Sequence, residues 1–311
     1  MTVRKVLAFT AVYVVWGSMY LAMKIGIESI PPLLLAALRS LIGGAVLFGW
    51  GRWRGGQAPT AAQWRTAILA GSLFFLCAHG GLFWALQYVP SGVASLFVAT
   101  IPIWMTAWQY ATEPGIHIGP RTIAGLIGGA GGIYLLVDPA SVLQGQRINP
   151  LGAAVLIGVA LSWTLGSVVA RRSTIRAVSV ATGSYLLCGG TLLLLVSGLA
   201  GEWSAIAGHP VTGRSVGGLA YLIVFGTVTT FSAYNWLLRH TTLASLSTYA
   251  FVNPVVAVFL GWTFGGESIG SRVAVAMIVI LASVALSLSA QAKFRRRPED
   301  DAVAAPASRT N

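Results

Sequence analysis

The stretch 6–25, VLAFTAVYVVWGSMYLAMKI, decides the fold class of this chain. It runs for twenty residues with a single charge, Lys24, next to its end. A helix needs about 20 mostly apolar residues to cross the hydrocarbon core of a bilayer. Arg4 and Lys5 precede the stretch, as basic residues precede a signal peptide, but the apolar run is longer than a signal peptide's core. We therefore interpret it as a membrane-spanning helix.

Nine further apolar segments follow at short intervals. They are 32–50, 67–86, 91–111, 122–137, 151–170, 178–199, 216–238, 245–264 and 273–289. Hydrophobic residues make up 56% of the sequence and charged residues 9%, whereas a soluble domain carries about 25% charged residues. The sequence therefore predicts an all-α integral membrane protein with ten transmembrane helices. It leaves no gap long enough for a soluble catalytic domain.

The basic residues are concentrated in alternate loops. Of the 20 Lys and Arg residues, 15 fall at one set of segment ends and four at the other, with Arg39 inside the second segment. Cytoplasmic loops carry the excess of Lys and Arg, so we predict that both termini are cytoplasmic and that the chain crosses the cell inner membrane several times. The charges follow the loops and form no single stripe. We therefore expect no nucleic-acid partner, despite a net charge of +12.

An internal repeat is indicated by residues that recur at a spacing of 152. Trp84, Leu86, Ser95 and Pro102 correspond to Trp236, Leu238, Ser247 and Pro254. Each half holds five segments, and because five is odd, the second half enters the membrane from the opposite side. We therefore expect two inverted five-helix repeats, 1–140 and 150–290, followed by a disordered cytoplasmic tail, 291–311.

Several short motifs resemble the EamA family of the drug/metabolite transporter (DMT) superfamily, and most closely its YedA-type members. They are Trp16-Gly17-Ser18, Lys24-Ile25-Gly26, Pro31-Pro32, Ala37-Leu38-Arg39, 89–95 (VPSGVAS), Ile101-Pro102, Ala233-Tyr234, 249–257 (YAFVNPVVA) and Gly265-Gly266-Glu267. The resemblance implies ten helices, cytoplasmic termini, a central cavity, and export of amino acids or other metabolites. The family's Gly-Glu pair is less well matched after the fourth segment, where Glu113 is followed by Pro114 and Gly115.

Aromatic and polar side chains within the segments are the candidate substrate-binding residues, because such rings combine apolar area with one polar group. They are Trp16, Tyr20, His79, Trp104, Trp163, Ser167, Tyr234, Tyr249 and Asn253. Helix packing or lipid contact is the alternative interpretation for each. Pro102 and Pro254 lie at matching points of the two halves and loosen the helix ladder. We therefore predict a pair of hinges there, with static kinks as the alternative.

Charged and titratable groups are scarce at membrane depth. All eight acidic residues lie at segment ends, in loops or in the tail, which argues against a buried carboxylate that exchanges a proton for a cation. His79 is the one candidate proton carrier, and packing is its alternative role. Arg39 either holds an anionic group of a substrate or ties helices together through backbone carbonyls; we favour the second interpretation.

The function predicted from these features is that of a secondary transporter, not an enzyme. It would export or exchange small metabolites, with amino acids as the leading class, by alternating access around a central aromatic-lined cavity. A multidrug efflux protein for aromatic or cationic compounds is the alternative, and a membrane-embedded enzyme or assembly factor is a third. We expect no cofactor and no metal. The expected partners are a small-molecule substrate and membrane lipid, with coupling to protons or a counter-solute left open, in a monomer or weak homo-oligomer.

Overall fold

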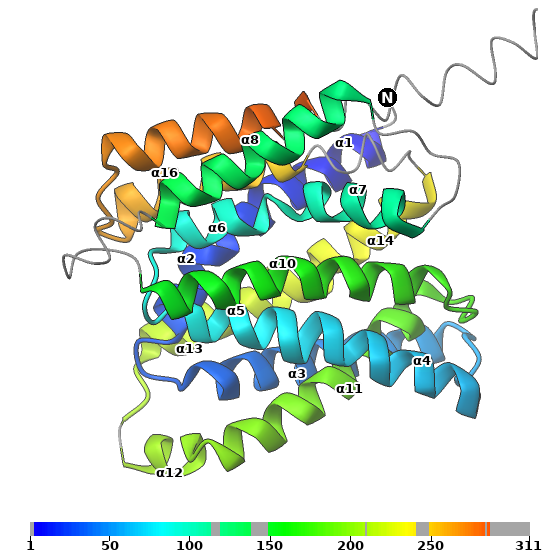
Figure 1. Ribbon diagram of the computed structural model, residues 1–311. Helices are drawn as coiled ribbons and strands as arrows, with labels where there is room; N and C mark the ends of the chain where they lie inside the picture. The colour runs from blue at the N-terminus through cyan, green and yellow to red at the C-terminus, as the bar shows by residue number, and fades with distance from the viewer. Residues whose placement is uncertain are drawn as a thin grey trace, which may run out of the picture.

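The computed structural model describes residues 3–112, 119–137, 149–208, 210–240, 249–283 and 285–286. Within these ranges the regular structure is helical (Figure 1). The first half contains α1 (Val3–Thr10), η1 (Ala11–Val15), α2 (Trp16–Gly26), α3 (Pro32–Trp53), α4 (Ala61–Gly71), η2 (Ser72–His79), α5 (Gly80–Ala85), α6 (Ser91–Val98), α7 (Ile101–Thr112) and α8 (Pro120–Val137). Three features named above lie outside the described residues. They are the predicted tail (291–311) and the residues Glu113 and Ser247.

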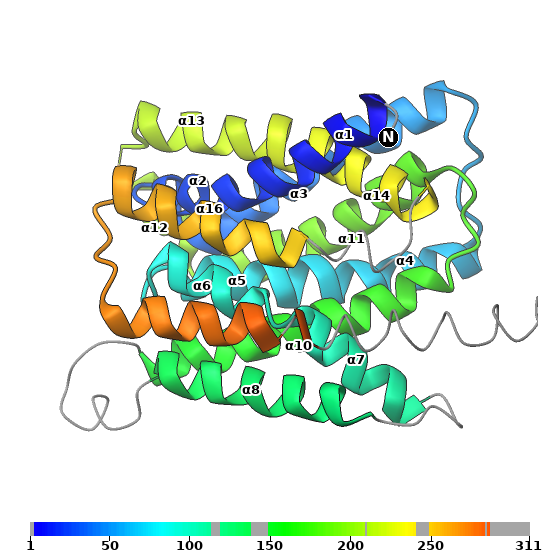
Figure 2. The same ribbon diagram turned by 90° about the horizontal axis from the view of Figure 1, so that it is seen from above.

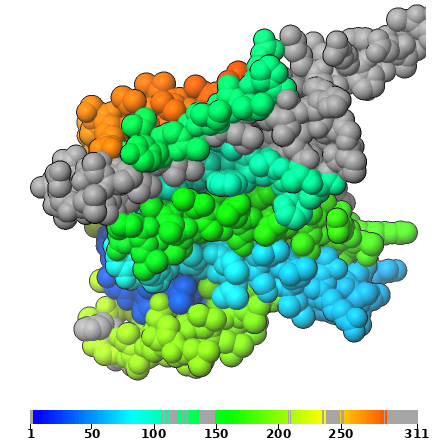
Figure 3. All heavy atoms as spheres, in the orientation of Figure 1, coloured from blue at the N-terminus to red at the C-terminus, as the bar shows by residue number. Residues whose placement is uncertain are grey.

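The second half has a similar succession of helices. It contains α10 (Pro150–Arg171), α11 (Val178–Leu199), α12 (Glu202–Ala207), α13 (Gly213–Tyr221), η3 (Leu222–Thr229), α14 (Thr230–His240), α16 (Tyr249–Phe264) and an apolar helix, Ser271–Ser283. Seen from two directions, the long helices lie side by side with their axes roughly aligned (Figures 1 and 2). On the face in Figure 3, α10 crosses the middle, with α4 and α11 on one side and α8 on the other.

Six continuous helical stretches are long and apolar enough to cross a membrane. They are Val3–Gly26, Pro32–Trp53, Ala61–Ala85, Pro150–Arg171, Val178–Leu199 and Gly213–Tyr234. Shorter apolar helices account for the remaining four predicted segments: Ser91–Met105, Ile123–Gly132, Val252–Phe264 and Ser271–Ser283. Only 33–50% of each long apolar stretch is buried inside the protein, and large apolar side chains such as Leu199, Phe264 and Ile127 are exposed. Such a surface matches hydrocarbon and would be costly in water.

Three of the long stretches change to π-helical winding near their middle, in η1, η2 and η3. A π-helical turn loosens the usual ladder of backbone hydrogen bonds and is often found at functional sites. In η3 two of these backbone carbonyls accept hydrogen bonds from threonine hydroxyls five residues later. Thr227 Oγ1 donates to Leu222 O at 3.0 Å, and Thr230 Oγ1 donates to Phe225 O at 2.7 Å. The irregular winding is therefore satisfied by side chains from the same helix.

The fourth predicted segment is broken, which corrects the prediction of a mid-helix proline at Pro102. The segment consists of α6 and α7, separated by residues 99–100, so Pro102 lies in the first turn of α7. Proline is tolerated in a first turn because the backbone N–H groups there have no partner within the helix. Pro254, in contrast, lies inside α16. The two prolines therefore do not occupy equivalent positions in their helices.

Helices α3 and α6 each have a proline at the N-cap position. A carboxylate from the second half of the chain accepts hydrogen bonds from the first backbone N–H groups of each helix. Glu202 accepts hydrogen bonds from the backbone N–H groups of Leu33 (3.2 Å) and Leu34 (2.7 Å) at the start of α3. Glu267 accepts from Ser91 N (2.6 Å) and Gly92 N (3.1 Å) at the start of α6. Because proline has no side-chain oxygen to cap a helix, the carboxylates satisfy N–H groups that would otherwise lack partners.

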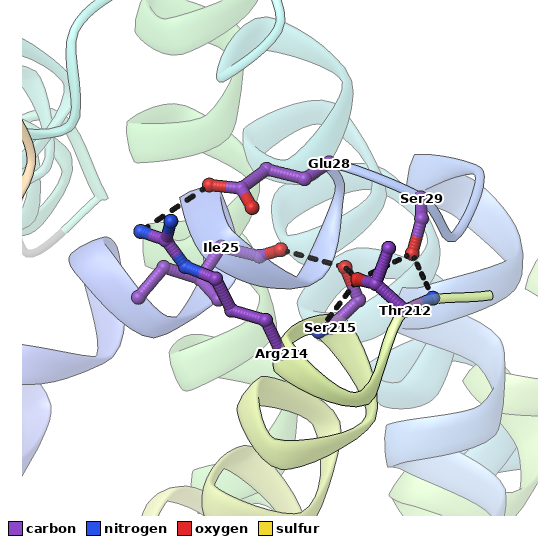
Figure 4. Close-up of polar contacts among 6 residues, drawn as sticks. All are labelled: Ile25, Glu28, Ser29, Thr212, Arg214 and Ser215. Carbon is purple, nitrogen blue, oxygen red and sulfur yellow. Dashed lines mark hydrogen bonds and ion pairs between the residues drawn. The ribbon is translucent and has the colours of Figure 1, made fainter.

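The same end of the bundle carries contacts between α2 and α13 (Figure 4). Ser215 Oγ donates to Ile25 O at 2.9 Å, and Thr212 N donates to Ser29 Oγ at 3.0 Å. Arg214 Nη2 lies 3.5 Å from Glu28 Oε1, and both side chains are substantially exposed. We call this set of contacts, together with the two carboxylate caps, the polar end of the bundle.

The most extensive helix packing joins α3 to α11, and glycines lie at the contact. A Cβ atom on Gly183 would lie 2.5 Å from Phe48 N, and one on Gly44 would lie 2.9 Å from Leu186 Cβ. Small residues allow helix backbones to approach closely in membranes. The close contact between α3 and α11 therefore depends on glycine having no side chain at these positions.

We expect Gly183→Ala to lower the apparent melting temperature of the protein in detergent. The added methyl group has no space, and overpacking of this kind costs about 1–3 kcal/mol. Gly158→Ala is the matched control, because nothing lies within 4 Å of a Cβ atom built on Gly158. Equal melting temperatures for the two variants would show that α3 and α11 do not depend on this contact.

Candidate functional site

An internal cavity lies between the two halves of the chain. Its volume is about 70 Å³, several times the space needed by one water molecule, about 10–15 Å³. It is lined by Trp16, Met19, Tyr20, Met23, Ala78, His79, Leu82, Val98, Ile101, Val159, Trp163, Phe231, Tyr249 and Asn253. These residues come from α2, η2, α5, α6, α7, α10, α14 and α16. Helices far apart in sequence therefore meet around one cavity.

Six of the nine predicted binding residues line this cavity: Trp16, Tyr20, His79, Trp163, Tyr249 and Asn253. Trp16 lies at the centre of the aromatic wall. Its ring centroid is 5.5 Å from that of Phe231, 5.4 Å from that of Tyr249 and 6.3 Å from that of Trp163. Edge contacts of this kind favour a fixed arrangement of rings. The cavity thus presents aromatic faces and edges that are held in place by one another.

Two residues of the cavity wall, Trp163 and His79, carry polar ring atoms. Trp163 Nε1 is buried and has no hydrogen-bond partner among the described residues. His79 Nδ1 lies 2.8 Å from Phe74 O, and because a carbonyl only accepts, Nδ1 must carry the proton. In the neutral ring Nε2 is then the acceptor. The rings of His79 and Trp163 are 5.5 Å apart, so a donor and an acceptor lie close together in the wall.

Asn253 has a partly structural place in the wall. With its amide oriented to satisfy both partners, its nitrogen donates to Tyr13 O at 2.8 Å and to Val12 O at 3.1 Å. Both carbonyls belong to η1, where the π-helical winding leaves backbone groups open to such bonds. Asn253 therefore ties α16 to η1 while it lines the cavity.

The other three predicted binding residues lie outside the cavity lining. Trp104 Nε1 donates to Thr100 Oγ1 at 3.1 Å, across the break between α6 and α7. Ser167 Oγ donates to Trp163 O within α10. The ring of Tyr234 packs 4.9 Å from that of Trp16. These residues support or adjoin the wall and do not form it.

Phe231 is an important wall residue that the sequence reasoning missed. Its ring lies 5.7 Å from Phe75, 6.2 Å from His79 and 6.3 Å from Trp163. The available signal was its position three residues before Tyr234, which places both on one side of a helix. Met19 and Met23 were also missed, although they lie on α2 close to Trp16 and Tyr20.

The charges of the described residues lie away from the cavity lining. Glu28, Glu202 and Glu267 are the acidic residues in this part of the chain, and all three lie at helix ends. Arg39 is only 2% exposed. Its Nε donates to the hydroxyl of Thr227 at 2.8 Å, which corrects the favoured prediction that it binds backbone carbonyls. No group of three or more His, Cys, Asp or Glu side chains in the described part could hold a metal ion.

Comparison with known proteins assigns the family. The model of the EamA-like transporter family matches residues 4–138 and again 150–289. The chain belongs to this family. As an EamA protein it is 34% identical to the uncharacterized inner membrane transporter YedA of Escherichia coli (strain K12), over 94% of this chain and 92% of that protein. The predicted membership of the DMT superfamily is confirmed with it.

More distant relatives match this chain over a similar length. The chain is 26% identical to the uncharacterized transporter YoaV of Bacillus subtilis (strain 168), over 91% of this chain and 96% of that protein. A crystal structure of a protein with 25% identity superposes with a TM-score of 0.63, covering 91% of this chain and 96% of the other. Both named relatives are called transporters. The chain matches nearly the whole length of each. The function class of this EamA protein is therefore that of a membrane transporter.

We expect Asn253→Leu to lower the apparent melting temperature, because it removes the amide donor to the Val12 and Tyr13 carbonyls. Interhelical hydrogen bonds in membranes contribute about 0.6–2 kcal/mol. Ser167→Ala is the control, since Ser167 bonds only within its own helix among the interactions described above. If both variants melt together, Asn253 does not tie α16 to η1.

Proposed function

We propose that this EamA protein is a secondary transporter of the inner membrane that exports or exchanges small metabolites, with amino acids as the leading class. The observation that carries the proposal is the cavity between the two halves, with aromatic walls and an unpartnered donor beside an acceptor. A binding site near the midplane between two halves is the usual arrangement in secondary transporters. Trp163 Nε1 suits an anionic or carbonyl oxygen, and His79 Nε2 suits an ammonium or hydroxyl group. An amino acid offers both in one small molecule.

The proposal includes ten spans built as two inverted five-helix repeats. Three features support it. Thr60 and Thr212, 152 residues apart, each cap the helix that follows. The π-helical segments η2 and η3 begin 150 residues apart, at Ser72 and Leu222. The chain enters α4 at the end of the bundle opposite to the one where it enters α13 (Figure 1).

Helix contacts across the halves support the same symmetry. The first span meets the ninth through α2 and α16, and the sixth meets the fourth through α10, α6 and α7. The third meets the sixth through η2 and α10, while the eighth meets the first through α13 and α2. Each contact is thus matched by one between the corresponding spans of the other half. We assign 1–140 and 150–290 as the two repeats.

The excess of basic residues in one set of loops supports the proposal that both termini are cytoplasmic. The polar end of the bundle then faces outward. Its contacts, with a further bond from Lys24 Nζ to Leu86 O (2.7 Å), join helices of the two halves and of the first half at that end. Alternating access requires such contacts to break and re-form. Exposed ion pairs such as Glu28–Arg214 suit this purpose because they contribute little to stability. Pro254 inside α16, and the break before Pro102, are the proposed flexible points.

The transport assay compares Trp163→Phe with wild-type protein in liposomes that exchange labelled phenylalanine or other amino acids. The substitution keeps an aromatic ring and removes the unpartnered N–H. We expect transport at low substrate concentration to fall about 3- to 10-fold, since one neutral hydrogen bond contributes about 0.5–1.5 kcal/mol.

Trp104→Phe is the matched control, because the Trp104 N–H is already bonded to Thr100 outside the cavity lining. Equal transport by both variants would remove Trp163 from the binding site. Transport of lipophilic cations but not of amino acids would favour the multidrug alternative. If wild-type protein moves none of these solutes, the amino-acid assignment is wrong.

His79 is expected to act as a hydrogen-bond acceptor and not as a proton carrier. Its ring packs against the rings of Phe75, Trp163 and Phe231, and its Nδ1 proton is committed to Phe74 O. His79→Gln should weaken substrate affinity and leave the shape of the pH profile of transport unchanged. A profile that becomes flat between about pH 5 and 8, the range in which histidine ordinarily titrates, would instead assign proton coupling to His79.

A further inference from the structure

Arg39 is the charged side chain that the proposed transport cycle does not yet use. It lies on α3, in the middle of an apolar helix, and is 2% exposed. Its Nη1 and Nη2 atoms are both buried and have no hydrogen-bond partner in the described part of the chain. A guanidinium group stays charged in proteins. A buried charge without a partner is strongly unfavourable, so it normally marks a site where a partner binds.

The described carboxylates are all engaged elsewhere. Glu202 accepts bonds from the start of α3 and from Ser197 Oγ at 2.8 Å. Glu267 accepts bonds from the start of α6, and Glu28 faces Arg214. None of these contacts involves Arg39. The counter-charge for Arg39 must therefore come from outside this set of groups.

The guanidinium is held in a fixed orientation. Its Nε donates to Thr227 Oγ1, whose own proton is given to Leu222 O in η3. Its Cζ lies 5.9 Å from the ring centroid of Phe83 on α5. With Nε occupied on one side, the two Nη atoms remain for a ligand. Arginine presents such nitrogens as a planar fork that matches the two oxygens of a carboxylate.

The site lies directly behind the cavity wall. Arg39 is close enough to His79 to interact with it electrostatically, and His79 lines the cavity. Phe83 follows the lining residue Leu82, and Gly226, next to Thr227, packs against Met19 of the wall. Methionine is flexible and readily changes its position. A group in the cavity could reach the Nη atoms only if wall residues such as Met19 moved aside.

We infer that Arg39 Nη1 and Nη2 form a buried subsite for one small anionic group, the carboxylate of the transported solute, with a chloride ion as the other source of the same charge. The inference rests on the proposed transport function and narrows its substrates to carboxylate-bearing solutes. Arg39 would then bind the carboxylate, Trp163 Nε1 would donate to one of its oxygens, and His79 Nε2 would accept from the ammonium group.

The first experiment measures how well L-phenylalanine and L-phenylalaninamide compete for exchange in liposomes. The two molecules differ in the carboxylate alone. We expect wild-type protein to prefer phenylalanine by about 10- to 100-fold, as a charge-assisted hydrogen bond predicts. Arg39→Gln should abolish this preference, and Arg39→Lys should keep part of it, since lysine retains the charge without the fork.

Thr227→Val is the matched control. It removes the bond to Arg39 Nε but leaves the charge and both Nη atoms. If Arg39 only ties α3 to η3, Thr227→Val and Arg39→Gln should have the same effect on melting temperature and neither should alter the preference. A preference for phenylalanine that persists in Arg39→Gln would overturn the inference. If Arg39→Gln does not fold, Arg39→Lys against Thr227→Val decides the question.

A second experiment is independent of transport. Purified protein in a low-salt buffer free of chloride and carboxylates is melted with propionate, with the neutral propionamide, and with chloride. Propionate should raise the melting temperature of wild-type and Thr227→Val protein but not of Arg39→Gln, and propionamide should have no effect. If chloride raises the melting temperature and propionate does not, the site binds a small anion but not a carboxylate. No protection by either anion would overturn the site, whatever the transport assay shows.

Discussion

The hydrocarbon core of a membrane contains no water, so every backbone polar group within it must find its partner inside the protein. Regular helices meet this requirement by themselves. This EamA protein departs from regular helix at the π-helical segments and at the break between α6 and α7. In η3 and at the break, side-chain hydroxyls close the gap. Thr100, for example, donates to Phe97 O and accepts from Trp104 Nε1. The distribution of polar side chains at depth follows largely from this requirement.

The same departures shape the cavity. The carbonyl of Phe74 in η2 fixes the tautomer of His79, and the carbonyls of η1 hold the amide of Asn253. Most polar groups near the cavity are therefore committed to the backbone. Trp163 Nε1 is an exception among the described residues. A cavity with few available polar atoms and many ring faces discriminates by shape and by a small number of hydrogen bonds.

The composition predicted the all-helical membrane fold, and the motifs predicted the family; both predictions are confirmed. The arrangement of the site was harder to predict. Residue spacing gives the direction of a side chain only on a regular helix, and the helices here change their winding or break. The break before Ile101 moved Pro102 into a first turn and paired Trp104 with Thr100. Phe231 was overlooked because a phenylalanine in an apolar segment has no polar atom to distinguish a cavity from a lipid contact.

Charge is divided between the ends and the middle of the bundle in a way that bears on the cycle. At the polar end, Glu202 and Glu267 satisfy helix N-termini, and if that end opened as the proposed cycle requires, water could replace the lost bonds. At depth, no such replacement exists for Arg39 while the cavity is closed. On this account the closed state is more favourable with an anionic group bound than without one. An empty carrier would then close less readily than a loaded one, and this difference favours exchange of one solute for another over net movement in one direction.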